Sequence, residues 1–300
     1  MRLKDGARVE ESFDTLQHLC AADGVSLAYR RRLPFRPAAS TALVLLHGAA
    51  SNGTRWWHFV DHTQLTNHLL LAPDLRGHAD SVWRGPARMD QWCDDLVALL
   101  DHEQVARAVV AGHCLGANLA VHFAARYPAR CAGVVLIEPM LSEALTGRMA
   151  WLRRLAPLLR LGAWVIGRVN RLGVFRRRLR RVHLRELDAP VQVADTHDLL
   201  EVHGSLRHDA GVLPLAQLLG NFVELLRPLP LAELKAPALV IQASGRRMTD
   251  AALTRRRLEP ALASARFVEL PSEHWLPTTH PDRLRVLIDE WVASLEGRQD

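Results

Sequence analysis

The sequence predicts an α/β protein with a mostly parallel, doubly wound sheet and a helical cap insertion. Short apolar runs, typical of strands buried on both faces, alternate along the chain with segments whose apolar residues have helical spacing. This alternation favours a parallel sheet with helices on both faces. It stops at residues 140–232, where the pattern is helical without a clear buried strand. We therefore expect that segment to lie over the carboxyl edge of the sheet.

The elements follow in order along the chain. Two strands are expected within residues 16–32, joined at Asp23-Gly24, a strong hairpin signal. Six more strands are expected at the apolar runs 41–48, 68–74, 105–112, 131–139, 236–244 and 265–272. Helices are expected at 89–103, 115–127 and 281–297. The predicted domains are a core of residues 1–139 and 233–300 and an arginine-rich cap of residues 140–232.

The composition of the chain limits the kinds of protein that it can be. The chain has 300 residues, 49% of them hydrophobic, which is enough for one large α/β core. Its net charge of +6 is local, because residues 147–185 contain twelve arginines and no acidic residue. The four cysteines lack metal-site spacing and the first residues lack an apolar signal segment, so we expect reduced thiols in a cytoplasmic protein. Because no matching motif is present, we expect neither a metal, a cofactor nor a nucleic-acid partner.

One short segment, AGHCLGAN at residues 111–118, contains the candidate catalytic residue. It places Cys114 between Gly112 and Gly116 at a predicted strand-to-helix junction. A tight turn there strains its central residue and leaves no room for side chains two positions away. The apex then projects into the cleft above the sheet, at a helix N-terminus that favours an anion and lowers the pKa of a thiol. We therefore predict that Cys114 is a nucleophile; the alternative is a small buried cysteine in an ordinary turn.

GHCLG, residues 112–116, resembles the G-x-S-x-G nucleophile elbow of the α/β-hydrolase fold superfamily, with cysteine in place of serine. LLHGAASNGTRWW, residues 45–57, resembles the family's loop after the third strand. APDLRGHADS, residues 72–81, resembles its D-x-R-G-x-G-x-S segment, with Ala79 at the second glycine, and PSEHWLP, residues 271–277, resembles its histidine loop. The resemblance covers nearly the whole chain outside the cap, and it implies the α/β-hydrolase fold and acyl-transfer chemistry.

The resemblance also implies the partners of Cys114. His274 follows the last predicted strand, where the family's catalytic histidine lies, and is the expected base. The family's most frequent position for the acid falls on Arg246 or Met248 here, with Asp250 a little further on, and its other position corresponds to Glu138. We favour Glu138, because a glutamate that ends a buried strand needs a partner such as a histidine N–H, whereas Asp250 requires a rearranged loop. The backbone amides of Ala49 and Leu115 are expected to form an oxyanion hole.

Residues beside these motifs have supporting roles. The substrate site is expected to be lined by His47, Gly48, His113 and Trp275, and the two histidines among them are expected to pack or to orient loops. Asp74 and Arg76 are expected to hold the neighbouring loop without taking part in chemistry.

These residues predict a hydrolase that cleaves a carboxylic ester or thioester of an apolar, small-molecule acyl substrate through an acyl-cysteine. An acyltransferase that uses the same intermediate and a non-catalytic binding protein of this fold are the alternatives. Haloalkane dehalogenase and epoxide hydrolase chemistry need a carboxylate at the apex, which Cys114 excludes. The arginine-rich cap suits an anionic membrane surface, an acyl carrier or coenzyme A, or it simply solvates its charges.

Overall fold

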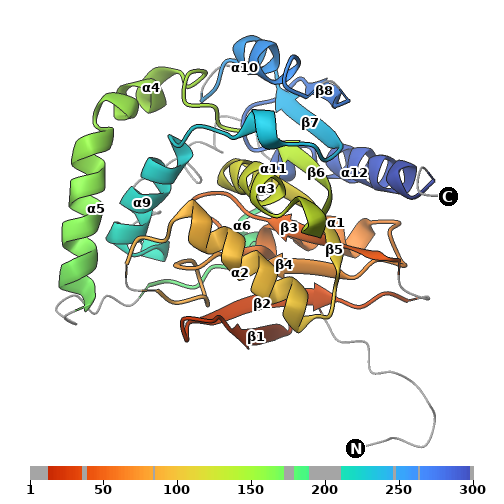
Figure 1. Cartoon of the computed structure of the whole chain (residues 1–300), viewed down its shortest axis with the longest axis horizontal. Helices are drawn as coiled ribbons and strands as arrows, with labels where there is room; N and C mark the ends of the chain where they lie inside the picture. The colour runs from red at the N-terminus through yellow and green to blue at the C-terminus, as the bar shows by residue number, and fades with distance from the viewer. Residues whose placement is uncertain are drawn as a thin grey trace, which may run out of the picture.

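The computed structural model describes residues 13–35, 39–83, 85–171, 179–188, 211–245, 248–262 and 264–297. These residues form an eight-stranded sheet in the order β1-β2-β4-β3-β5-β6-β7-β8 (Figure 1). Its strands are β1 (Leu16–Cys20), β2 (Ser26–Arg32), β3 (Thr41–Leu46), β4 (Leu70–Pro73), β5 (Arg107–His113), β6 (Cys131–Ile137), β7 (Ala238–Ala243) and β8 (Arg266–Leu270). β2 pairs antiparallel with β1 and β4, and the other neighbours pair in parallel, so the predicted fold class is confirmed.

The central strands are buried on both faces, as the apolar runs predict. Alternate residues of β3 divide between two cores: Val44 and Leu46 pack with helices α2 (Met89–His102) and α3 (Leu115–Arg126). Leu43 and Leu45 pack on the opposite face with α1 (Trp57–His62) and α12 (Pro281–Glu296). The remaining core helices are η1 (Gly53–Trp56), η2 (Pro128–Arg130), η4 (Leu231–Glu233), α10 (Ala251–Leu258) and α11 (Leu276–Thr279).

The last strand differs from its expectation in burial. A strand forms at β8, but of its residues only Leu270 is buried, and the others are half-buried or exposed. The reason is its position, because β8 ends the sheet and pairs with β7 alone. The apolar run therefore predicted correctly that a strand forms here and wrongly that the strand is buried on both faces.

Four described helices lie in the insertion between β6 and β7: α4 (Gly147–Arg154), α5 (Ala156–Arg171), α6 (Leu184–Asp188) and α9 (Leu215–Leu225). Figure 1 shows α5 beside α9 at one flank of the molecule, with α5 outermost. Residues 172–178 and 189–210 of the predicted cap lie outside the described residues, as does the amino-terminal stretch on which a signal segment would fall. Among the described helices, none is long and apolar enough to cross a membrane.

Candidate active site

The turn between β5 and α3 places Cys114 in a strained conformation. Its backbone has φ 56° and ψ −113°, in a region that residues with a side chain rarely adopt. The turn is close-packed, because a Cβ on Gly112 would overlap the backbone of Gly116, and a Cβ on Gly116 would lie 2.6 Å from the carbonyl oxygen of Leu46. The backbone amide of Cys114 donates to the carbonyl of Ile137 at 2.9 Å. The side chain is held at the amino end of α3 and is nearly buried.

Glu138 and His274 meet beside this turn. Glu138 follows β6 directly, also at positive φ (52°), and its carboxylate is buried. One carboxylate oxygen accepts from the amide of Ala243 at 2.5 Å, and the other lies 3.1 Å from Nδ1 of His274. Because Nδ1 faces the carboxylate, Nε2 is the ring nitrogen left for Cys114. A backbone donor and an imidazole thus satisfy both oxygens of a buried carboxylate.

The surroundings of His274 favour its charged form. Burial alone would lower the pKa of His274, but the charge and hydrogen bonding of Cys114 and of Glu138 raise it to about 10. In contrast, burial raises the pKa of the Cys93 and Cys131 thiols to about 12. Of these three buried cysteines, Cys114 is the one that adjoins this histidine.

The loop after β3 lies against the nucleophile turn. A Cβ on Gly48 would lie 3.4 Å from Nδ1 of His113 and 3.5 Å from Cβ of Cys114, so the backbone of Gly48 adjoins both. In the turns and loops of the described residues, neither the amide of Ala49 nor that of Leu115 donates a backbone hydrogen bond. Leu115 begins α3, where amides have no partner within the helix. Two amides near Cys114 are therefore available to an oxyanion.

The structure separates the residues expected to line the substrate site. His47 is fully buried, with Nδ1 2.8 Å from the Gly48 carbonyl and Nε2 accepting from the amide of Leu75 at 3.0 Å. Burial and the neighbouring His78 lower the pKa of His47 well below its ordinary value, so it is neutral. These contacts hold the His47 ring between the loop after β3 and the backbone of Leu75.

His113 and Trp275 both adjoin His274. Nε2 of His113 lies 2.9 Å from the carbonyl oxygen of His274, and the two rings lie 4.9 Å apart. The half-buried Trp275 ring stands edge-on to His274 at 5.8 Å, where α11 begins. His113 thus holds the backbone of the histidine loop, and Trp275 borders the imidazole.

Asp250, the alternative acid, has a different role. Its carboxylate accepts from the amide of Leu253 at 2.9 Å and caps the amino end of α10. The contacts of the described residues include none between Asp250 and His274. The structure brings Glu138 to the histidine and leaves Asp250 as a helix cap.

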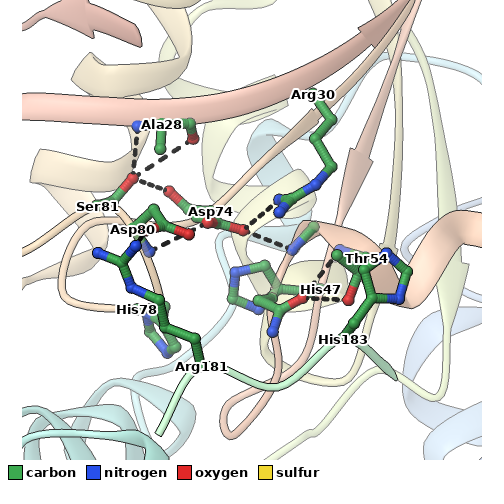
Figure 2. A network of polar contacts seen from close by, with 12 residues as sticks. Ala28, Arg30, His47, Thr54, Asp74, His78, Asp80, Ser81, Arg181 and His183 are labelled. Carbon is green, nitrogen blue, oxygen red and sulfur yellow. Dashed lines mark hydrogen bonds and ion pairs between the residues drawn. The ribbon is translucent and has the colours of Figure 1, made fainter. Parts of the chain in front are cut away.

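A buried polar network fixes the neighbouring loop (Figure 2). One carboxylate oxygen of Asp74 accepts from the amide of Gly53 at 2.8 Å and the other from the amide of Asp80 at 3.2 Å, while Arg30 lies 3.4 Å away. Ser81 donates to the carbonyl of Asp74 at 2.6 Å. Burial raises the pKa of Asp74, although Arg30 opposes the shift. These contacts agree with the loop-holding role predicted for Asp74.

Three polar side chains near the site escaped the sequence reasoning. Asn118 of α3 exchanges two hydrogen bonds of 2.9 Å with the backbone of Met140, just after Glu138. Asn221 of α9 donates to the carbonyl of Ala49 at 2.6 Å and accepts from Gln217 at 2.7 Å. The sequence carries a signal for all three, because each is an amide residue within an otherwise apolar helical run.

A buried ion pair also joins the cap to this region. Arg55, in the loop after β3, contacts both carboxylate oxygens of Asp188 of α6 at 2.9 and 2.8 Å, and Thr278 of α11 at 2.6 Å. The indole of Trp57 donates to the same carboxylate at 3.2 Å. One cluster thus connects the cap, the loop after β3 and the segment after His274.

The parallel sheet, the strained turn and the Cys114–His274–Glu138 grouping define an α/β protein built around a nucleophile elbow. The chain belongs to the alpha/beta hydrolase fold family, whose model matches residues 41–281. It is similar to Lipase LipV of Mycobacterium tuberculosis, with 36% identity over 35% of this chain and 40% of that protein. It is also similar to the dihydrolipoyllysine-residue acetyltransferase component of the acetoin cleaving system of Pseudomonas putida, with 34% identity over 36% of this chain and 30% of that protein.

Solved structures resemble the chain over most of its length. The enol-lactonase of Burkholderia xenovorans superposes with a TM-score of 0.66 at 21% identity, covering 92% of this chain and all of that one. At this identity the likeness shows the fold alone. The two curated relatives match the chain over less than half of their own lengths.

Proposed function

We propose that the protein is a hydrolase that cleaves carboxylic esters or thioesters of apolar acyl groups, with Cys114 as nucleophile, His274 as acid and base, and Glu138 as the acid of the triad. The observation that carries this proposal is His274, held by the Glu138 carboxylate on Nδ1 and raised in pKa by the adjoining Cys114. A charged imidazole beside a thiol at a helix N-terminus supports a thiolate–imidazolium pair.

In the first half of the reaction the thiolate of Cys114 attacks the carbonyl carbon of the substrate, and the carbonyl electron pair moves to oxygen. The amides of Ala49 and Leu115 stabilise this oxyanion. When the tetrahedral intermediate collapses, the bond to the leaving group breaks and His274 gives its proton to the departing alkoxide or thiolate. The product is an alcohol or thiol, and the acyl group remains as a thioester on Cys114.

In the second half His274, now neutral, takes a proton from water. The hydroxide attacks the thioester, the carbon–sulfur bond breaks, and a carboxylic acid leaves with the Cys114 thiolate restored. Glu138 keeps the imidazole in the tautomer and orientation that both steps require. Its pairing with Nδ1 is the geometry that supports its role over that of Asp250.

A second candidate reaction follows from the relatives. An acyltransferase forms the same acyl-cysteine and replaces water with an alcohol or thiol acceptor. The acetyltransferase component of Pseudomonas putida, similar over 113 residues, supports this candidate, whereas Lipase LipV, similar over 105 residues, supports hydrolysis. Both reactions use the same three side chains and differ only in the acceptor.

The test is intact-mass analysis of the protein after exposure to p-nitrophenyl esters and acyl thioesters of graded chain length. We expect a mass increase of one acyl group, mapped to Cys114, and turnover that disappears in Cys114→Ala. Cys93→Ala is the matched control and should keep full activity. A Cys114→Ala protein as active as its parent overturns the proposal. Added alcohol or thiol acceptors, followed by product analysis, separate transfer from hydrolysis.

A further inference from the structure

The outermost cap helix presents an apolar face to solvent. Four large apolar side chains of α5 are exposed: Leu158 at 66%, Leu161 at 58%, Trp164 at 56% and Val165 at 43%. Their spacing of three, four and seven residues places them on one face of the helix. Trp151 of α4, the helix that precedes α5, is also exposed, at 58%. We call these five residues the cap face.

The cap face is unusual because the opposite side of α5 is already packed. Ala163 and Gly167, on that other side, are buried, and α5 lies beside α9 (Figure 1). The exposed apolar residues are therefore not needed to hold the helix on the protein. A contiguous apolar strip that a fold leaves in water marks an interaction surface.

Arginines surround the cap face. Arg154, Arg160 and Arg168 are exposed, and among the described residues no carboxylate pairs with them. The guanidinium of Arg168 lies 5.3 Å from the ring centre of Trp164. The sequence from 147 to 185 holds no acidic residue, so α4 and α5 themselves contribute only positive charge to this surface.

A groove beside the cap face gathers part of this charge. It lies between α5, α9 and the loop before α2, and Arg88, Arg160 and Arg168 line it together with Trp83 and Trp164. Glu224 also lines the groove, but its carboxylate accepts from the amide of Met89 at 3.0 Å and lies 3.6 Å from Arg227. The groove therefore offers three guanidinium groups to an anion beside an apolar strip.

We propose that the cap face docks on a membrane surface of anionic phospholipid, with its apolar side chains in the interface and the groove arginines on headgroup phosphates. An amphipathic helix with Trp and Leu on the apolar side and arginines beside it binds such surfaces. A second copy of this chain is disfavoured, because it would bring two positive faces together. Binding of an acidic protein in place of lipid is one of the outcomes that the test below distinguishes. This inference does not depend on the proposed reaction.

The test is flotation of the full-length protein with vesicles of phosphatidylcholine alone and of phosphatidylcholine mixed with phosphatidylglycerol. We expect binding to the mixed vesicles that weakens as salt rises. Arg160→Glu/Arg168→Glu should reduce the partition coefficient about tenfold or more. Arg255→Glu/Arg256→Glu on α10 changes the net charge equally from another surface and should keep most of the binding.

The apolar contribution has its own pair of variants. Leu161→Ser/Trp164→Ser should lose binding to mixed vesicles, whereas Phe35→Ser, which removes an exposed aromatic residue outside the cap, should not. Unchanged melting temperatures and unchanged circular dichroism spectra show that the variants are folded. The proposal is overturned if the parent protein does not float with mixed vesicles at low salt, or if charge reversal on α10 removes binding as fully as reversal on α5. Self-association or binding of an acidic protein without vesicle binding also overturns it.

Discussion

Glu138 is the residue on which the acid assignment depends. Both of its carboxylate oxygens are used, one by the amide of Ala243 and one by His274, so the carboxylate has a single orientation. The charge and hydrogen bonding of Glu138, together with those of Cys114, raise the pKa of His274 against the effect of burial. Removing this charge should therefore have two separate consequences, one on rate and one on pH dependence.

Glu138→Gln should lower kcat by about 10- to 100-fold, less than the roughly 10⁴-fold loss in a serine triad, because a thiolate–imidazolium pair forms without the acid. Activity of the parent should fall on the alkaline side near pH 10, where the raised pKa of His274 lets the imidazolium lose the proton that the leaving group needs. In Glu138→Gln one of the groups that raises this pKa is gone, so the alkaline limb should move to lower pH. Profiles of kcat/KM against pH measure both effects.

Asp250→Asn is the control for this prediction. Its carboxylate caps α10, and the amide oxygen of an asparagine can accept the same hydrogen bond, so the substitution should change stability little and leave the alkaline limb in place. A larger loss of turnover in Asp250→Asn than in Glu138→Gln would show that the acid is misassigned.

The four cysteines differ in a way that labelling can measure. Iodoacetamide near neutral pH should modify Cys114 before the exposed Cys20, because the proposed reaction requires a nucleophilic sulfur at Cys114 and the thiolate is the form that iodoacetamide alkylates. Cys93 and Cys131, whose pKa values burial raises to about 12, should stay unmodified in the folded protein. His274→Ala should slow labelling of Cys114 to the rate of Cys20 or below. Equal labelling of Cys114 and Cys20 in the parent would contradict an activated thiolate.

At the scale of the element, the pattern of apolar residues was sufficient to predict the strands that are buried on both faces of the sheet. The apolar runs at β3, β4, β6 and β7 predicted strands buried on both faces, because a parallel sheet covered by helices has no polar side. The same reasoning failed for the burial of β8, because an apolar run in the sequence does not indicate whether the strand pairs with one neighbouring strand or with two. Position in the sheet is a property of topology, which the order of elements in the sequence leaves open.

The candidate site shows a similar division. The nucleophile turn could be predicted from the sequence because a tight turn restricts the residues next to its apex. It requires glycines such as Gly112 and Gly116 two positions on either side of Cys114. The placement of His274 and Glu138 came from family resemblance, since 136 positions separate them in the chain. Asn118 and Asn221 were missed because their hydrogen-bond partners are backbone groups of loops that are distant in the sequence. Almost every residue has the same backbone groups, so no sequence pattern marks these partners. Contacts of that kind are visible only in three dimensions.

At the scale of the molecule, polar contacts attach the cap to the loop after β3, which adjoins Cys114. Asn221 of α9 binds the carbonyl of Ala49, and Asn52 donates to the carbonyl of Val182 at 2.8 Å. The amide of Leu184 donates to the hydroxyl of Thr54 at 2.9 Å. Since the loop after β3 recurs in these contacts, the position of the cap and the geometry of the proposed oxyanion hole are coupled.

The buried ion pair of Arg55 and Asp188 also attaches the cap, and its contribution to stability can be tested by substitution. Both side chains are almost fully buried, and the carboxylate meets the guanidinium at 2.8 Å. Asp188→Asn leaves the arginine charge buried without its counter-ion, so the free energy of unfolding should fall by roughly 3 kcal/mol. The matched control is Asp61→Asn, which removes the exposed pair that Arg185 of α6 makes with α1, and it should cost less than about 1 kcal/mol.

Denaturant unfolding monitored by tryptophan fluorescence measures both variants. The double variant Arg55→Met/Asp188→Leu should recover much of the stability that Asp188→Asn loses, because it removes both charges and keeps apolar volume in the cluster. Equal and small losses in Asp188→Asn and Asp61→Asn would mean that the buried pair does not fasten the cap. In that case the cap would be held by the packing of α9 and its hydrogen bonds to the loop after β3, and Asn221→Ala would then be the more damaging substitution.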